Sequence, residues 1–112
     1  MLVYLPVVYV ISRHGTLDGS AHDYEFSPLG YEVEVILMSL GTSPLYARLD
    51  GTTATIAGDD TLVVPGNSAR EFVASQVPIS GGGPGYKISV NGAASAPATD
   101  YTIELKQRVN HA

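Results

Sequence analysis

Turn-forming dipeptides at short intervals constrain the fold of this chain more than any other feature. Asp50-Gly51 is typical of a type I′ hairpin, and Asn91-Gly92 is a second signal of the same kind. Between the turns, apolar and polar residues alternate, as in Tyr86–Val90 and Tyr101–Leu105, and no segment shows a 3.6-residue period. The pattern predicts an all-β fold: a small antiparallel β-sandwich or barrel of seven to eight short strands.

Size and composition suit one such domain. The chain has 112 residues with twelve glycines and seven prolines, and only 15% of its residues are charged. Many turn formers and few charges favour short strands joined by tight turns over a helical bundle. Residues 1–112 are therefore predicted to form a single β domain. Within it we expect an apolar N-terminal strand or arm at 1–12, a long polar loop at 13–30 and a sandwich body at 31–108.

Two connections inside the body are predicted from their residues. After Asp50-Gly51, Ala54 and Ile56 alternate with threonines, which predicts a return strand directly after the turn. The run Gly81–Gly85 lacks the Gly-Lys-Ser/Thr ending of a phosphate-binding loop, so it is predicted to be a flexible connection.

The N-terminal segment is apolar on both faces. Leu2–Ser12 carries apolar residues at odd and even positions, so a strand formed there needs a second surface to cover one face. Pro6 places that strand at an edge or bulge, because proline cannot donate to a ladder. Another subunit supplies the covering surface, or the segment is the ordinary first strand of the sandwich; both interpretations stay open. In the first, the predicted interface residues are Leu2, Val3, Tyr4, Leu5, Val7, Val8 and Tyr9.

Charge and segment length weigh against two classes of partner. The formal net charge is −5, and only Lys106 and Arg108 lie close together, so no basic stripe for nucleic acid is predicted. The N-terminal apolar run spans about 11 residues, whereas a membrane-spanning helix needs about 20. It also lacks a preceding basic residue and a small-residue cleavage site, so neither a membrane span nor a signal peptide is expected.

The tyrosines divide by strand phase. Tyr31, Tyr86 and Tyr101 are in phase with apolar residues and are predicted to lie in the core or at its edge. Tyr46 alternates with Leu45 and is the best candidate for an exposed aromatic side chain, so it completes the predicted interface set.

Catalysis is not expected. The chain has no cysteine and no G-x-S-x-G elbow, and only three histidines. Five potential metal ligands fall in the predicted polar loop, but without the spacing of a strand or helix site, so we expect no metal and no cofactor. These five residues are His14, Asp18, His22, Asp23 and Glu25.

The sequence resembles that of small β-sandwich virion proteins of tailed bacteriophages. The resemblance lies in Pro44–Glu71, with its Asp-Gly turn, Gly-Asp-Asp turn and Val-Val-Pro strand end, and in the alternating segments Tyr86–Val90 and Tyr101–Leu105. It covers about half of the chain and includes no catalytic or binding motif.

The resemblance implies a structural component of a phage virion, assembled in the host cytoplasm and present in many copies. A capsid decoration (cement) protein that binds the major capsid protein and stabilises the head shell is the first expectation. A neck or tail accessory protein comes next. A carbohydrate-binding or receptor-binding sandwich is the competing class and requires exposed aromatic side chains on one face or at loop tips.

Overall fold

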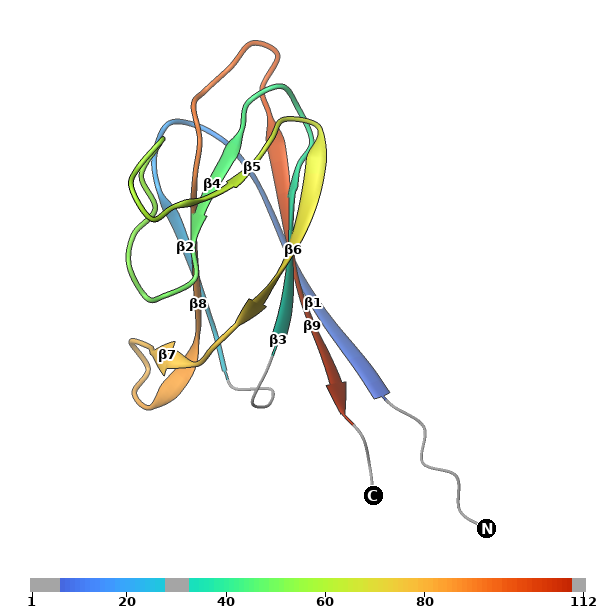
Figure 1. The fold of residues 1–112 in the computed structure, drawn as a ribbon, viewed down its shortest axis with the longest axis vertical. Coiled ribbons are helices and arrows are strands. Elements are labelled where there is room, and N and C mark those ends of the chain that lie inside the picture. Colours follow the sequence, from blue (N-terminus) through green and yellow to red (C-terminus); the bar gives the residue numbers. More distant parts are fainter. Residues whose placement is uncertain (1–6, 28–32, 110–112) are drawn as a thin grey trace.

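The computed structural model describes residues 7–27 and 33–109 and shows nine strands in two antiparallel sheets that face each other (Figure 1). The first sheet contains, in spatial order, β1 (Val7–Thr16), β9 (Asp100–Val109), β3 (Val33–Ser39) and β6 (Ser68–Ala74). The second contains β2 (His22–Phe26), β8 (Pro84–Asn91), β4 (Leu45–Arg48) and β5 (Leu62–Val64), with β7 (Val77–Pro78) also paired to β8. The all-β sandwich prediction is confirmed, with nine strands in place of seven to eight.

The strand order is that of a jelly roll. Along the chain, β1, β3, β6 and β9 fall in the first sheet, and β2, β4, β5, β7 and β8 fall in the second, so most connections cross between the sheets. Successive strands therefore rarely pair with each other, and the pairing partners come from distant parts of the sequence. In the first sheet this order leaves β1 at one edge and β6 at the other.

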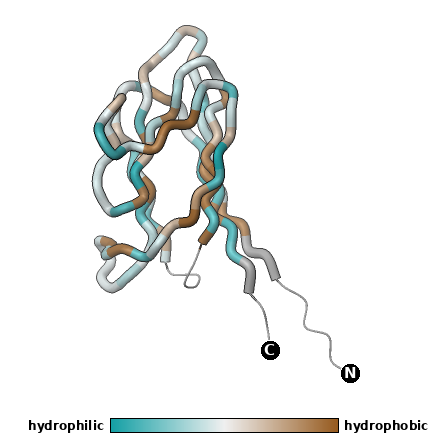
Figure 2. Tube along the Cα trace, viewed as in Figure 1, coloured by the Kyte–Doolittle hydropathy of each residue, from teal (hydrophilic) through white to brown (hydrophobic). Residues whose placement is uncertain are grey.

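Alternation along the strands builds the core. On β3, Val33, Val35 and Leu37 are fully buried while Glu34 and Ile36 between them are half-buried. Figure 2 shows hydrophobic positions on both walls of the sandwich, separated by hydrophilic ones. Burying each large aliphatic side chain stabilises the fold by about 1.5–3 kcal/mol. The inward residues of β8 and β9 complete this core: Tyr86, Ile88, Val90, Tyr101, Ile103 and Leu105. The core positions predicted for Tyr86 and Tyr101 are confirmed, and Tyr31 lies outside the described residues.

The prediction of a polar loop at 13–30 is wrong for residues 13–16 and 22–26, which belong to strands. β1 continues to Thr16, and its residues pair with β9 as far as Asp100. β2 then occupies His22–Phe26, with Phe26 buried, Tyr24 half-buried and Asp23 exposed. The alternation was hidden because histidine occupies one of the inward positions and reads as polar in the sequence.

The return strand predicted after Asp50-Gly51 is also absent from the described residues: β4 ends at Arg48 and β5 begins at Leu62. The segment between them lies against β8 instead. The buried backbone N–H of Ala54 donates to Ser89 Oγ (2.8 Å), and Asn91 Nδ2 donates to the Ala54 carbonyl (3.1 Å). These two side chains satisfy the backbone groups that a hairpin partner would otherwise take.

The glycine-rich run forms a tight turn. Val77 pairs with Gly85 across it, and the N–H of Gly82 donates to the Ile79 carbonyl at 3.0 Å. Gly82 and Gly83 adopt φ angles of 90° and 75°, which favour glycine. The prediction of a flexible connection is therefore replaced by a short hairpin that joins β7 to β8.

Candidate functional site

The edge strand β1 is the longest surface available for pairing. Its ten residues pair with β9 from Val7 to Thr16, and within the described residues β9 is its only strand neighbour. Natural edge strands are commonly protected by charge, proline or a bulge. From Val7 to Ser12 this strand has neither charge nor proline, and Val10 is 54% exposed. This edge is therefore suited to contact with another chain.

The predicted interface residues fall in three places. Leu2, Val3, Tyr4 and Leu5 lie outside the described residues. Val7, Val8 and Tyr9 belong to β1 and pair through their backbones with Val109, Arg108 and Gln107. Tyr46 lies on β4 between the buried Leu45 and Ala47, facing away from the core, but it is half-buried rather than freely exposed. The structure does not bring Tyr46 together with β1, because the two belong to different sheets.

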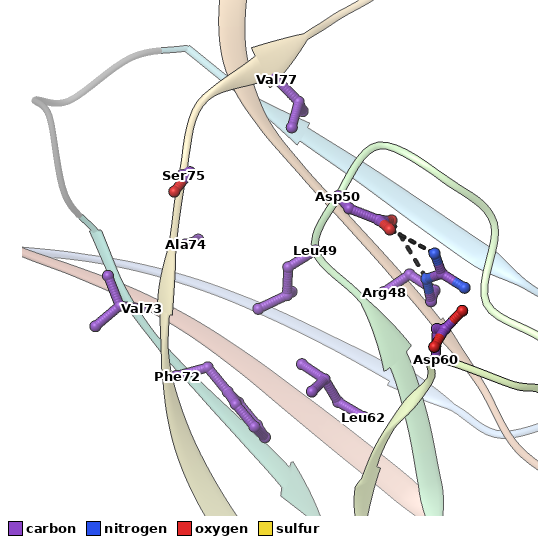
Figure 3. A pocket seen from close by; sticks show the side chains of 10 residues that line it. All are labelled: Arg48, Leu49, Asp50, Asp60, Leu62, Phe72, Val73, Ala74, Ser75 and Val77. Carbon is purple, nitrogen blue, oxygen red and sulfur yellow. Dashed lines mark hydrogen bonds and ion pairs between the residues drawn. The ribbon is translucent and has the colours of Figure 1, made fainter.

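A groove opens between β4, β5 and β6, on the side of the sandwich opposite β1 (Figure 3). Its volume is about 460 Å³. Figure 3 shows the side chains of Leu49, Leu62 and Phe72 in the space between the strands. All three are half-buried and pack against the core, so the floor of the groove is apolar and continuous with the interior. Val73, at its margin, is the most exposed large hydrophobic side chain among the described residues, at 63%.

One rim of the groove carries charges that satisfy one another. Arg48 forms an ion pair with Asp50 and donates to the Asp59 carbonyl (3.2 Å). Asp50 also accepts from the backbone N–H and the hydroxyl of Thr52, at 3.1 and 2.6 Å. The hydrogen bonds from Arg48, and then those from Thr52, hold the pKa of Asp50 well below its usual range. The charges of Arg48 and Asp50 are therefore paired, and Asp50 acts as a turn former. Asp60 also lines this rim, and its charge acts on Arg48.

Arginines stack on phenylalanines on both open sides of the sandwich. Arg13 lies 5.2 Å from the centroid of the Phe26 ring, on the β1 and β2 side. Arg70 lies 5.0 Å from the Phe72 ring and also donates to the Val63 carbonyl (2.8 Å), so it bridges β6 to β5. The groove lies beyond this bridge, where β6 runs toward β7 (Figure 3).

The five potential metal ligands predicted in one polar loop lie on β1, β2 and the connection between them, and most of them have separate partners. His14 Nδ1 lies 3.0 Å from Thr102 Oγ1, and His22 Nε2 lies 2.8 Å from Asp18 Oδ1. Asp23 faces Lys87, and Glu25 accepts from Ser80, which lowers the pKa of Glu25. No group of three possible ligands occurs in the described part of the chain.

The groove was missed from the sequence because its walls come from three separated segments. The only signal was that Leu49, Leu62 and Val73 are apolar residues next to turns or on short strands. The described residues include no helix that is long and apolar enough to cross a membrane.

No protein-family model matches the chain, and no curated protein matches it. It is similar to a solved structure of Bacillus endospore appendages, which form a family of disulfide-linked pili. The two chains are 15% identical, the similarity covers 98% of this chain and 92% of the other, and the TM-score is 0.59. At this identity the similarity concerns the fold, and it agrees with the sandwich described above.

Proposed function

We propose that the protein is a non-enzymatic structural subunit that assembles in many copies. The observation that carries the proposal is the unprotected edge of β1, ten residues long and without a charged residue before Arg13. The segment that precedes β1 in the sequence is also apolar and without charge. A protein that works as a solitary binder would be expected to block such an edge.

A virion is the assembly that the sequence resemblance favours. In this form the protein decorates the head shell of a tailed phage and contacts the major capsid protein as well as other copies of itself. Jelly-roll sandwiches are common in viral capsid proteins, which is compatible with this role. Burial of apolar surface between neighbours would then help the shell to resist internal pressure.

A filament is the second candidate, and the similarity to a pilus protein favours it. That protein forms disulfide-linked pili, whereas this chain has no cysteine. Contacts other than disulfides would therefore join the copies in a filament of this protein. Repeated head-to-tail contacts give an open filament or a closed ring, so the geometry of the contact decides between them.

Sedimentation velocity and electron microscopy of the purified full chain test the proposal. We expect concentration-dependent assembly, and we expect Val10→Lys on the β1 edge to weaken it. Ile56→Lys is the matched control, because Ile56 is similarly exposed (42%) but lies in the connection between β4 and β5. A wild-type chain that stays monomeric at every concentration, or an equal effect of both substitutions, would overturn the proposal. Immunogold labelling then separates phage heads from tails and from filaments.

A further inference from the structure

We propose that the groove between β5 and β6 receives the N-terminal segment of a second copy of this chain, bound as an added strand on the edge of β6. The inference rests on the proposed function, since it names the partner and the site through which copies join. It assigns a role to the groove and to the predicted interface residues Leu2–Leu5 together.

The groove fits an uncharged, apolar occupant. Its floor of Leu49, Leu62 and Phe72 is continuous with the core, and its charges lie on one rim, where Arg48 is paired with Asp50. A charged ligand would lose its hydration without gaining an ion-pair partner on this floor. An apolar side chain placed there instead covers surface that water now contacts.

The N-terminal segment has the required chemistry. It contains no charged residue from Met1 to Ser12, and it is apolar at both odd and even positions. When an extended segment adds to a strand edge, alternate side chains point to opposite faces. One set would enter the groove, and the other would pack beside Val73, which is 63% exposed on the outer face of β6.

The lengths also agree. Six residues precede β1, and at about 3.3 Å per residue an extended segment of this size spans about 20 Å. The edge of β6 comprises seven residues, from Ser68 to Ala74, and within the described residues β3 is its only strand neighbour in the sheet. The segment is thus longer than the part of that edge that lines the groove, Phe72 to Ala74.

The segment that fills the groove comes from a second copy because β1 and β6 lie at opposite edges of the first sheet. β9 and β3 lie between them, so β1 and β6 are about 14 Å apart at normal strand spacing. The backbone of Val7 is paired with Val109, at the same end of the sheet as Ala74, so the groove lies across the width of the sheet from it. To reach its own groove, the segment would have to reverse and cross the sheet.

Strand direction fits a repeating contact. Each neighbouring pair in the first sheet is antiparallel, so β1 and β6 run in opposite directions. A second copy related by translation therefore brings the segment before its β1 antiparallel to β6. Because donor and acceptor are different surfaces, each added copy presents a new groove, and the contact repeats.

Photo-crosslinking of the full chain tests the inference. We place p-benzoylphenylalanine at the position of Tyr4, mix isotopically light and heavy chains, and map the cross-links by mass spectrometry. Cross-links between light and heavy copies, ending at Leu49, Leu62, Phe72 or Val73, are expected. The same amino acid at the position of Tyr46, which faces away from the core on β4, is the control and should not label the groove.

Val73→Lys is the matched variant, because an exposed position tolerates the change without loss of the fold. It should reduce the cross-link yield about tenfold, since it introduces a charge beside an apolar occupant. Val63→Lys, on the outer face of β5, should leave the yield unchanged. If the chain assembles but the cross-links fall within one copy or outside the groove, this inference is wrong while the proposed function stands. A chain that never assembles contradicts the proposed function itself.

Discussion

The hydroxyl groups of Tyr24 and Tyr101 lie 2.5 Å apart and form a hydrogen bond that joins the two sheets. Tyr24 stands on β2 in the second sheet, and Tyr101 on β9 in the first. Their rings meet edge to face, with centroids 6.4 Å apart. Tyr101 is 1% exposed whereas Tyr24 is half-buried, so the two ends of this bond have unequal access to water.

This inequality predicts unequal effects of removing each hydroxyl. Tyr24→Phe leaves the Tyr101 hydroxyl buried without its partner, and we expect it to reduce the free energy of unfolding by about 1–3 kcal/mol. Tyr101→Phe leaves the Tyr24 hydroxyl nearer to water, so we expect a smaller loss. Urea denaturation of both variants and of the double variant measures the coupling between them. Equal losses, or strict additivity in the double variant, would contradict the account.

The same pair predicts a loss of stability in alkali. Burial, and then the hydrogen bond to Tyr24, raise the pKa of Tyr101 above its ordinary value of 10.0. The folded state therefore retains this proton when the unfolded chain has begun to release it. The stabilisation is fully present below pH 10 and declines as the pH rises above it. Unfolding midpoints measured on both sides of this pH should fall less steeply for Tyr101→Phe than for the wild type.

Gly15 makes room for the Tyr101 ring. The two residues pair directly across β1 and β9, and a Cβ added to Gly15 would lie 2.5 Å from Tyr101 Cζ. We expect Gly15→Ala to lower the free energy of unfolding by about 1–3 kcal/mol through overpacking. Gly81→Ala is the control, because a Cβ there meets nothing within 4 Å. Similar thermal unfolding of the two variants would show that the strand shifts without cost.

The side chain of Ser89 fixes the long connection between β4 and β5. Ser89→Ala removes the acceptor of the buried Ala54 N–H, and leaving such a group unpaired costs about 1–3 kcal/mol. We expect faster hydrogen exchange at Ala54 and little change on β9. Thr55→Ala, at an exposed neighbour, should leave the exchange rate at Ala54 unaltered. Unchanged exchange at Ala54 in Ser89→Ala would mean that other contacts hold the segment.

Local patterns predicted the fold class because each strand's alternation is a property of its own residues. Ile103 and Leu105 are in phase on β9 whatever their partners are, and both are buried as that phase requires. The same reasoning failed at Asp50-Gly51, where the pattern of a hairpin competes with side chains 35 or more residues away. Ser89 and Asn91 bind Ala54 and draw the chain onto β8, and no local signal reveals this.

The candidate site was predicted only in part, for a related reason. The uncharged segment before Arg13 is a local feature, and the sequence identifies it. The groove depends on how β4, β5 and β6 meet across two sheets, so Leu62 and Phe72 give no sign of their proximity in the sequence. A site between strands that are distant in the sequence can be predicted only when the strand topology is known.

The boundary of β1 predicts how much of the N-terminus the fold requires. Removing residues 2–6 leaves every described pair between β1 and β9, so we expect the urea midpoint to be unchanged and assembly to be lost. Removing residues 2–12 also deletes the pairs from Val7 to Ser12, including the half-buried Ile11 that packs on the core, and should destabilise the domain by several kcal/mol. Circular dichroism during urea titration separates the two outcomes. A short deletion that unfolds the domain would show that the segment belongs to the sandwich itself, as its ordinary first strand, and would leave β1 without a separate arm.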